Sequence, residues 1–184
     1  GVSIPLYPAE HFYIITEPIE NLSKTLPVIR DFDNRTYIKE DAGKILVGIF
    51  EGNSIPAWDK TNKVPEDFSF GEFQENFEHF EPYLASAIKR FPVLEKAGIR
   101  KFFSGPESFT PDTNYLLGET AEIINFFVCC GFNSIGIGSG GGAGKVIAEW
   151  MIKGHTVEDL FSLDVKRFEK FNSSLKFIKE RVTE

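Results

Sequence analysis

Short runs of β-branched and aromatic residues, separated by turn residues, occupy the first fifty positions of this 184-residue chain. Such runs are typical of β-strands. The expected extended segments are residues 12–16, 27–31, 36–40 and 44–50. The last two flank Asp41-Ala42-Gly43, and this three-residue connection predicts a hairpin.

A helical spacing follows in residues 69–91. Ser69 and Glu72 form a capping box, and Pro82 is expected to kink the helix. One face carries a stripe that we interpret as core lining against a sheet, with Phe73, Phe77, Phe80, Leu84, Ala87, Ile88 and Phe91. Two further strands are expected at residues 99–103 and 115–117, with a proline-containing loop at 105–112 between them.

The most informative stretch is the glycine run that follows an apolar segment at residues 123–130. The apolar segment predicts a buried strand, and the amphipathic residues after the run predict a helix to residue 153. We interpret the glycines as a loop that contacts a cofactor, because glycine lets backbone approach a ligand closely. Glycine could instead serve tight packing of the helix on the sheet.

Two nucleotide-binding motifs compete with this interpretation. Gly136, Gly138 and Gly141 match G-x-G-x-x-G, but no second strand ending in an acid is expected after the helix. A P-loop fails because Ser139 replaces its first glycine and Val146 follows Lys145. Together the elements predict an α+β fold: a mostly antiparallel or mixed sheet with helices on one face, followed by a strand–loop–helix unit of another layer.

Composition narrows the functional classes. The net charge of −7 argues against a nucleic-acid partner, and no apolar stretch is long enough for a membrane span. The two cysteines are adjacent and show no disulfide or zinc spacing, which fits a reducing compartment. The chain starts at Gly1, and its single methionine is Met151, so we expect a piece of a longer or processed protein.

Few side chains are marked for chemistry. His11 and Tyr13 share one strand face, and a histidine there could act as a base or a hydrogen-bond donor, although a structural role is the commoner one. Tyr37 lies on the same side as Lys39, where a phenol and a cation could frame an anionic substrate or simply face solvent. No nucleophile or metal motif is marked by its spacing, which favours a reaction carried out by a cofactor.

An ordered set of motifs over nearly the whole chain resembles the flavin-dependent amine oxidoreductases of the D-amino-acid-oxidase superfamily, above all the dimethylglycine and sarcosine dehydrogenases and oxidases. The set includes Ala9-Glu10-His11-Phe12-Tyr13, Leu26-Pro27-Val28-Ile29-Arg30-Asp31, Tyr37-Ile38-Lys39-Glu40, Gly48-Ile49-Phe50-Glu51, Gly105-Pro106-Glu107-Ser108-Phe109-Thr110-Pro111-Asp112, Leu116-Leu117-Gly118-Glu119 and the glycine run.

The resemblance implies a fragment with a substrate-binding domain at residues 1–108, a return into the FAD-binding domain at 109–162 and a helical extension at 163–184. The rest of its own polypeptide would carry most of the FAD site, and a tetrahydrofolate domain often follows in relatives. It also implies oxidation of a small-molecule N-methyl amino acid by hydride transfer to FAD, in the cytoplasm or in the mitochondrial matrix of a eukaryote. No nucleic-acid or membrane partner is expected, and the fragment alone is expected to be inactive.

The resemblance also assigns residue roles. His11 and Tyr37 match active-site positions, and Lys39 stands at a substrate-binding position where many relatives have arginine. The positions that match cofactor contacts are Thr110, Pro111, Asp112, Ser134, Ile135, Gly136, Ile137, Gly138, Gly140 and Gly141. A non-catalytic regulatory or ligand-binding subunit of the same fold is the alternative, and the lysine at position 39 is consistent with it.

Overall fold

The computed structural model describes residues 1–58, 63–156 and 158–182. It divides into two compact units. Unit 1 comprises Gly1–Ala9, Asn53–Val64 and Glu107–Glu184, and unit 2 comprises Glu10–Gly52 and Pro65–Pro106. Two strands, β1 (Tyr7–Thr16) and β5 (Ile99–Phe109), begin in one unit and end in the other.

A five-stranded sheet in the order β2-β3-β4-β1-β5 forms the body of unit 2. Its other strands are β2 (Ile29–Asp31), β3 (Thr36–Asp41) and β4 (Lys44–Ile49). The β2–β3, β3–β4 and β4–β1 pairs are antiparallel, which confirms the predicted type of sheet. Asp41 pairs with Lys44, so the predicted hairpin forms, but its loop has two residues rather than three. Ala42 and Gly43 both have positive φ, 51° and 82°, as a two-residue hairpin turn requires.

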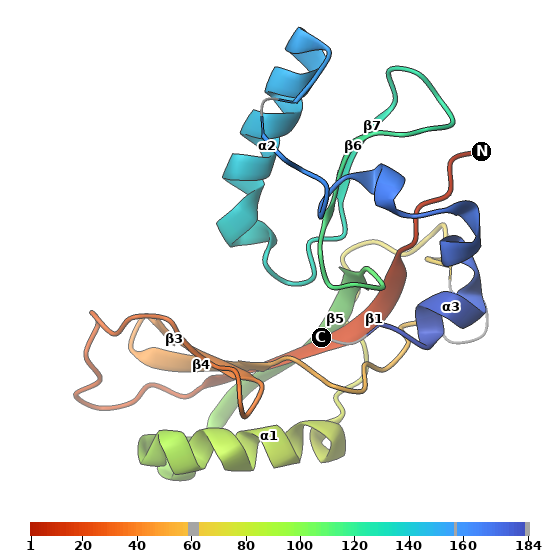
Figure 1. The fold of residues 1–184 in the computed structure, drawn as a ribbon. Helices are drawn as coiled ribbons and strands as arrows, with labels where there is room; N and C mark the ends of the chain where they lie inside the picture. The colour runs from red at the N-terminus through yellow and green to blue at the C-terminus, as the bar shows by residue number, and fades with distance from the viewer. Residues whose placement is uncertain (59–62, 157, 183–184) are drawn as a thin grey trace. The chain divides into compact units, whose positions relative to one another are not determined.

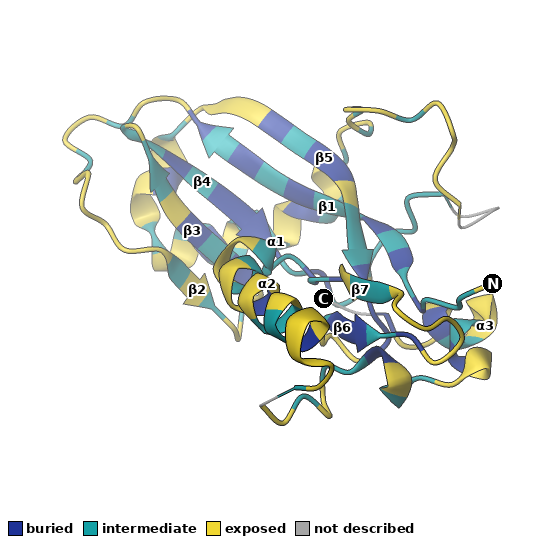
Figure 2. Ribbon diagram, turned by 90° about the horizontal axis from the view of Figure 1, so that it is seen from above, coloured by how far each residue is buried: buried dark blue, intermediate teal, exposed yellow. Residues whose placement is uncertain are grey.

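Helix α1 (Phe77–Arg90) lies along one face of this sheet (Figure 1). Phe80 is fully buried and packs edge-on against Phe102 of β5, with ring centroids 5.3 Å apart. Figure 2 shows the resulting alternation along β1, where the buried residues facing α1 include Phe12 and Ile14. The predicted stripe is only partly buried: Phe80 and Ala87 are in the core, whereas Phe77 is exposed. Phe73 and Phe91 lie outside α1.

The prediction that this helix begins at Ser69 is wrong. Phe70 has a left-handed φ of 51°, and the Phe73 amide donates to the Ser104 carbonyl of β5 at 2.7 Å. Both features hold the segment outside a helix. Asn76 is the actual cap, since its side-chain oxygen accepts from the His79 amide at 3.0 Å.

Unit 1 contains a two-stranded antiparallel sheet of β6 (Leu116–Glu119) and β7 (Phe127–Cys130), on which helix α2 (Gly136–Lys153) packs. The Trp150 ring of α2 lies 5.9 Å from Phe127 in an edge-on arrangement. A separate buried cluster joins the first strand to the chain end, with Tyr7, Ala9, Phe109, Ile178 and Val182. The C-terminal residues form the short helices η2 (Val165–Arg167), η3 (Lys170–Ser173) and α3 (Leu175–Lys179), and positions 183–184 of the predicted extension lie outside the described residues.

Three predictions of local structure in this part of the chain are wrong. Gly105 to Phe109 belong to β5 rather than to a loop. The strand expected from residue 123 starts only at Phe127, because Asn125 has a φ of 63° and its amide donates to Glu119, forming the turn between β6 and β7. The glycine run is not a loop, since α2 begins at Gly136 and includes it.

Among the described residues no strand follows α2, so the G-x-G-x-x-G match does not open a βαβ unit. None of the helices in residues 1–58, 63–156 and 158–182 has the length and apolar character needed to cross a membrane.

Candidate functional site

The sheet face of unit 2 opposite α1 carries a row of side chains in register. Arg30 of β2 pairs with Tyr37 of β3, Tyr37 pairs with Gly48 of β4, and Gly48 pairs with Tyr13 of β1. Residues paired across neighbouring strands project from the same face. The row is extended by Phe103 of β5, whose ring stacks on Tyr13 with centroids 4.6 Å apart.

His11 and Tyr37, the two predicted catalytic residues, lie together on this face. Their rings are nearly parallel, at 8°, with centroids 6.3 Å apart. Phe50 completes the group, because its centroid is 5.2 Å from Tyr37 and 6.2 Å from His11. Tyr37 and Phe50 are half-buried, and the His11 side chain is 13% exposed. An imidazole, a phenol and an apolar ring therefore meet on a surface that remains accessible within the unit.

Gly48 makes room for Tyr37. A Cβ on Gly48 would lie 2.0 Å from the Cζ atom of the Tyr37 ring and 2.2 Å from its hydroxyl oxygen. No side chain fits there unless the tyrosine moves. The glycine thus allows the phenol to lie flat across β4, toward β1 and His11.

Arg30 is a candidate that the sequence analysis missed. Its guanidinium carbon lies 4.0 Å from the centroid of Phe50 and 4.6 Å from that of Phe32, a cation–π arrangement. Among the described residues it has no carboxylate partner. Only the pairing of β2 with β3, which one sequence does not reveal, brings this cation beside Tyr37.

Lys39 is placed less favourably than Arg30. It lies two residues beyond Tyr37 on the same face of β3, and its side chain is 53% exposed. Its ammonium is 3.9 Å from the Asp41 carboxylate, a surface ion pair of little energetic weight. The structure thus brings His11 and Tyr37 together, while Lys39 faces a carboxylate of its own strand.

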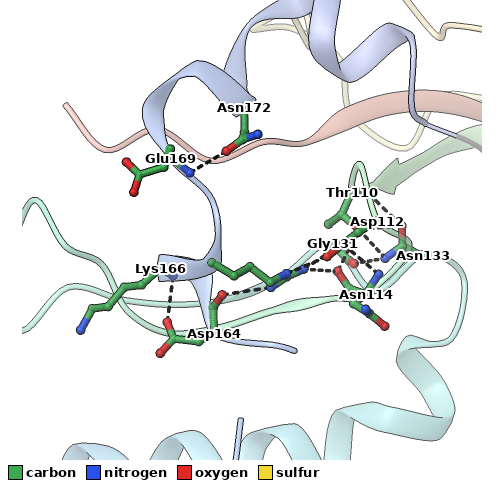
Figure 3. A network of polar contacts seen from close by, with 10 residues as sticks. Thr110, Asp112, Asn114, Gly131, Asn133, Asp164, Lys166, Glu169 and Asn172 are labelled. Carbon is green, nitrogen blue, oxygen red and sulfur yellow. Dashed lines mark hydrogen bonds and ion pairs between the residues drawn. The ribbon is translucent and has the colours of Figure 1, made fainter. Parts of the chain in front are cut away.

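The predicted cofactor residues Thr110 and Asp112 belong to a polar network in unit 1 (Figure 3). The buried Thr110 amide donates to the side-chain oxygen of Asn133 at 2.9 Å, and the Thr110 hydroxyl donates to the Asn114 carbonyl at 2.8 Å. The Asn133 amide nitrogen donates in turn to the Gly131 carbonyl. These bonds fix the loop after β5 against the loop that leads into α2.

Asp112 accepts two hydrogen bonds from Arg167, at 2.8 and 3.0 Å, in a bidentate pair. Partial burial alone would raise the pKa of the Asp112 carboxyl, but the hydrogen bonds and charge of Arg167 outweigh it and hold that pKa below its usual value. Arg167 also donates to the backbone carbonyls of Asn114 and Asp164. The pair therefore ties the predicted cofactor loop to η2. Any cofactor contact by Thr110, the buried Pro111 or Asp112 stays a prediction.

The other predicted cofactor residues lie at the start of α2. Ser134 donates to the Glu107 carboxylate at 3.5 Å, and Ile135 caps the helix without a side-chain hydrogen bond. Ile137 is fully exposed. Apart from the backbone of the helix itself, no atom of the described residues lies within 4 Å of the place where a Cβ would stand on Gly138, Gly140, Gly141, Gly142 or Gly144. Each of these glycines costs about 0.5–1 kcal/mol of helix stability relative to alanine. The contacts of the described residues give no packing reason for that cost.

Comparisons with known proteins agree on one family. The family model described as FAD dependent oxidoreductase matches residues 1–150. The 4-methylaminobutanoate oxidase (formaldehyde-forming) of Paenarthrobacter nicotinovorans is 42% identical over 184 residues, 100% of this chain and 22% of that protein. The mitochondrial pyruvate dehydrogenase phosphatase regulatory subunit of Mus musculus is 41% identical over 184 residues, 100% of this chain and 21% of that protein.

One further curated relative and one solved structure are also similar to this chain. The mitochondrial sarcosine dehydrogenase of Mus musculus is 40% identical over 182 residues, 98% of this chain and 19% of that protein. The chain thus spans about a fifth of the length of these curated relatives. Among solved structures, L-proline dehydrogenase from P. horikoshii superposes with a TM-score of 0.73 at 24% identity, over 92% of this chain and 42% of that one, which establishes similarity of fold.

The Asp112–Arg167 pair predicts a pH-dependent contribution to stability. A carboxyl whose pKa is lowered on folding stabilises the protein above its unfolded pKa of about 3.9, and that contribution is lost as pH falls through the lower folded value. Asp112→Asn should therefore be less stable than wild type at neutral pH, and the gap should close between about pH 5 and pH 2. Denaturant unfolding of the full-length protein at several pH values measures this difference in stability. A gap independent of pH would contradict the assignment.

Proposed function

This chain belongs to the FAD dependent oxidoreductase family, and we propose that it is part of a flavoenzyme that oxidises an N-methyl amino acid. The observation that carries the proposal is the cluster of His11, Tyr37 and Arg30 on one open sheet face. Two relatives support the substrate class by their names, 4-methylaminobutanoate oxidase and sarcosine dehydrogenase.

The start of α2 fits a flavin. Gly138, Gly140 and Gly141 in its first turns leave open the space that their Cβ atoms would fill, and Ile135 provides no side-chain cap for the first amides. A helix N-terminus of this kind attracts an anion, and bare backbone allows close approach. We propose that residues 134–141 hold part of FAD, which supplies the hydride acceptor when bound. The Thr110–Asn133 hydrogen bonds would keep this segment in position.

The open face of unit 2 would bind and orient the substrate. Arg30 would bind its carboxylate, because its guanidinium has no carboxylate partner among the described residues and offers a bidentate fork that Lys39 lacks. Tyr37 would hydrogen-bond the substrate, and Phe50 would pack against its N-methyl group. His11 would accept the proton that the ammonium must lose before its N-methyl carbon can donate a hydride.

The remainder of the polypeptide is the proposed partner of this chain. Exposed apolar side chains lie in unit 1 on α2 and just beyond it, at Ile137, Met151, Ile152 and Phe161. We propose that some of them contact the remainder of the polypeptide. Tetrahydrofolate as one-carbon acceptor stays a prediction, as do the cytoplasmic and mitochondrial locations. The names of the sarcosine dehydrogenase and the regulatory subunit place those two proteins in mitochondria.

A non-catalytic regulatory subunit remains the second candidate. It is favoured by the 41% identity to the pyruvate dehydrogenase phosphatase regulatory subunit over the whole chain. The two candidates separate when the full-length protein is mixed anaerobically with sarcosine, dimethylglycine or 4-methylaminobutanoate. Bleaching of bound flavin within seconds supports the enzyme, whereas unreduced flavin with every amine supports the regulatory subunit.

Substitution of Arg30 tests carboxylate binding. In the full-length enzyme, Arg30→Ala should raise KM for the carboxylated amine by roughly 10- to 100-fold, the loss of one charge-assisted contact. Lys39→Ala is the matched control, because it removes the same charge from the same face, and its KM should change less than threefold. Steady-state kinetics measure both variants. A larger effect for Lys39 than for Arg30 would restore the assignment made from sequence alone.

Substitution of Gly48 tests the placement of Tyr37. Gly48→Ala should push the phenol away from β4 and slow flavin reduction by roughly tenfold or more, since small displacements of an aligned group are costly. Tyr37→Phe should slow it comparably. The control is Gly52→Ala, because the atoms nearest to a Cβ there belong to the flexible end of the Arg35 side chain. Stopped-flow reduction measures all three, and equal rates for Gly48→Ala and wild type would reject the role of Tyr37.

Substitution in α2 tests the flavin contact. Gly138→Ala should favour the helix by about 0.5–1 kcal/mol and meet no clash within this chain. If flavin lies against this turn, the variant should nevertheless retain less of it. Gly144→Ala adds the same methyl group two turns further along α2 and should leave occupancy unchanged. The flavin-to-protein ratio and the thermal midpoint are measured together, and full occupancy in Gly138→Ala would refute the contact.

A further inference from the structure

A fully buried carboxylate lies directly behind His11. Glu51 follows β4, and its side chain is 0% exposed. One of its oxygens, Oε2, is 3.8 Å from Nδ1 of His11, whose side chain is 13% exposed. The other oxygen, Oε1, is 3.9 Å from Nε2 of His79, in the first turn of α1. The carboxylate thus stands between an imidazole on the substrate face and one on the helix face.

Burial of this carboxylate is unfavourable unless positive charge compensates it. Moving a carboxylate out of water costs several kcal/mol, and a nearby cation recovers part of that cost. The effect of Glu51 is seen at Glu10, where burial and then repulsion from Glu51 raise the pKa. The imidazoles at the two Glu51 oxygens are the groups of this cluster that can gain a positive charge near neutral pH.

We propose that Glu51 is a positioning residue for His11, which it orients and whose protonated form it stabilises during removal of a proton from the substrate amine. This inference rests on the proposed function of His11. The nitrogens of an imidazole lie on opposite sides of the ring, so Nδ1 directed at Glu51 leaves Nε2 directed away from it. With its proton held at Nδ1, His11 presents Nε2 as an acceptor.

The proton transfer is balanced. One N–H bond of the substrate ammonium breaks, its electron pair stays on the amine nitrogen, and a new N–H bond forms at Nε2 of His11. The positive charge passes from substrate to imidazole, where the Glu51 carboxylate offsets it. His79 competes for the same carboxylate from α1, so it should weaken the stabilisation of His11 when it is itself protonated.

Several other groups share this environment and enter any pH profile. The titratable or charged side chains around the cluster are Glu10 on β1, Tyr37 on β3, Arg30 on β2 against Phe50, and Tyr83 beside His79 on α1. A change in the pH dependence of flavin reduction can therefore be attributed to Glu51 only by comparing variants. Each variant must also retain its flavin.

Glu51→Gln in the full-length enzyme is the principal test. It keeps the shape of the side chain and removes the charge that favours protonated His11. The ascending limb of the flavin-reduction rate against pH should move about one unit lower, within the range of a charge 4–6 Å away. The plateau rate should fall about tenfold. Glu72→Gln is the control, because Glu72 carries the same charge but pairs with Lys101 at the surface of unit 2, and its profile should match wild type.

Failure of this inference differs from failure of the proposed function. If His11→Ala slows reduction while Glu51→Gln leaves the limb in place, Glu51 has no positioning role and the proposed function stands. If His11→Ala leaves the rate unchanged, the role of His11 itself is wrong. If the Glu51→Gln variant loses its flavin, the pH profile of His79→Gln tests the inference instead. Removal of the competing imidazole should move the limb to higher pH, and an unmoved limb overturns the inference.

Discussion

The strand register of unit 2 is the constraint on which the candidate active site depends. It aligns Arg30, Tyr37, Gly48 and Tyr13 in one row. The opposite face fixes this register, because its side chains are buried under α1, among them Ile14, Ile38 and Val47. A slip of one residue would expose that core and turn the functional side chains inward. Packing on the helix side therefore determines the chemistry on the open side.

The two groups of predicted cofactor residues, in the loop after β5 and at the start of α2, differ in the contacts that they make within the chain. In unit 1, the polar groups of Thr110, Asn133 and Arg167 find their partners within the chain and hold a loop in shape. In α2, by contrast, a Cβ on Gly138, Gly140, Gly141, Gly142 or Gly144 would meet no atom of the described residues within 4 Å, apart from the backbone of the helix itself. Thr110 and Asp112 are thus well explained as structural residues, whereas the open space along α2 is where we propose that flavin binds.

Sequence pattern predicted what depends on local signals. The hairpin of β3 and β4, the position of α1 and the order of strand and helix around residue 135 follow from periodicity and turn residues. Two errors have physical causes. A run of glycines with open surroundings can remain helical despite its low propensity, and the backbone bond from Phe73 to Ser104 overrides a capping box at Ser69.

The site was predicted as far as individual residues allow. His11 and Tyr37 were named from their strands and from resemblance, and the structure brings them together. Arg30 and Glu51 were not predicted as site residues, because the proposed role of each depends on a neighbour that is distant in the sequence. Arg30 gains its place through the β2–β3 register, and Glu51 through helix α1, which brings His79 to its second oxygen.

Two features of this chain each carry a cost in stability. The glycines of α2 weaken a helix, and the position of Glu51 removes a carboxylate from water. Natural sequences tolerate such departures mainly where function requires them. One lies in the predicted flavin segment and the other directly behind the predicted base. The proposed roles in binding flavin and in moving a proton would account for both.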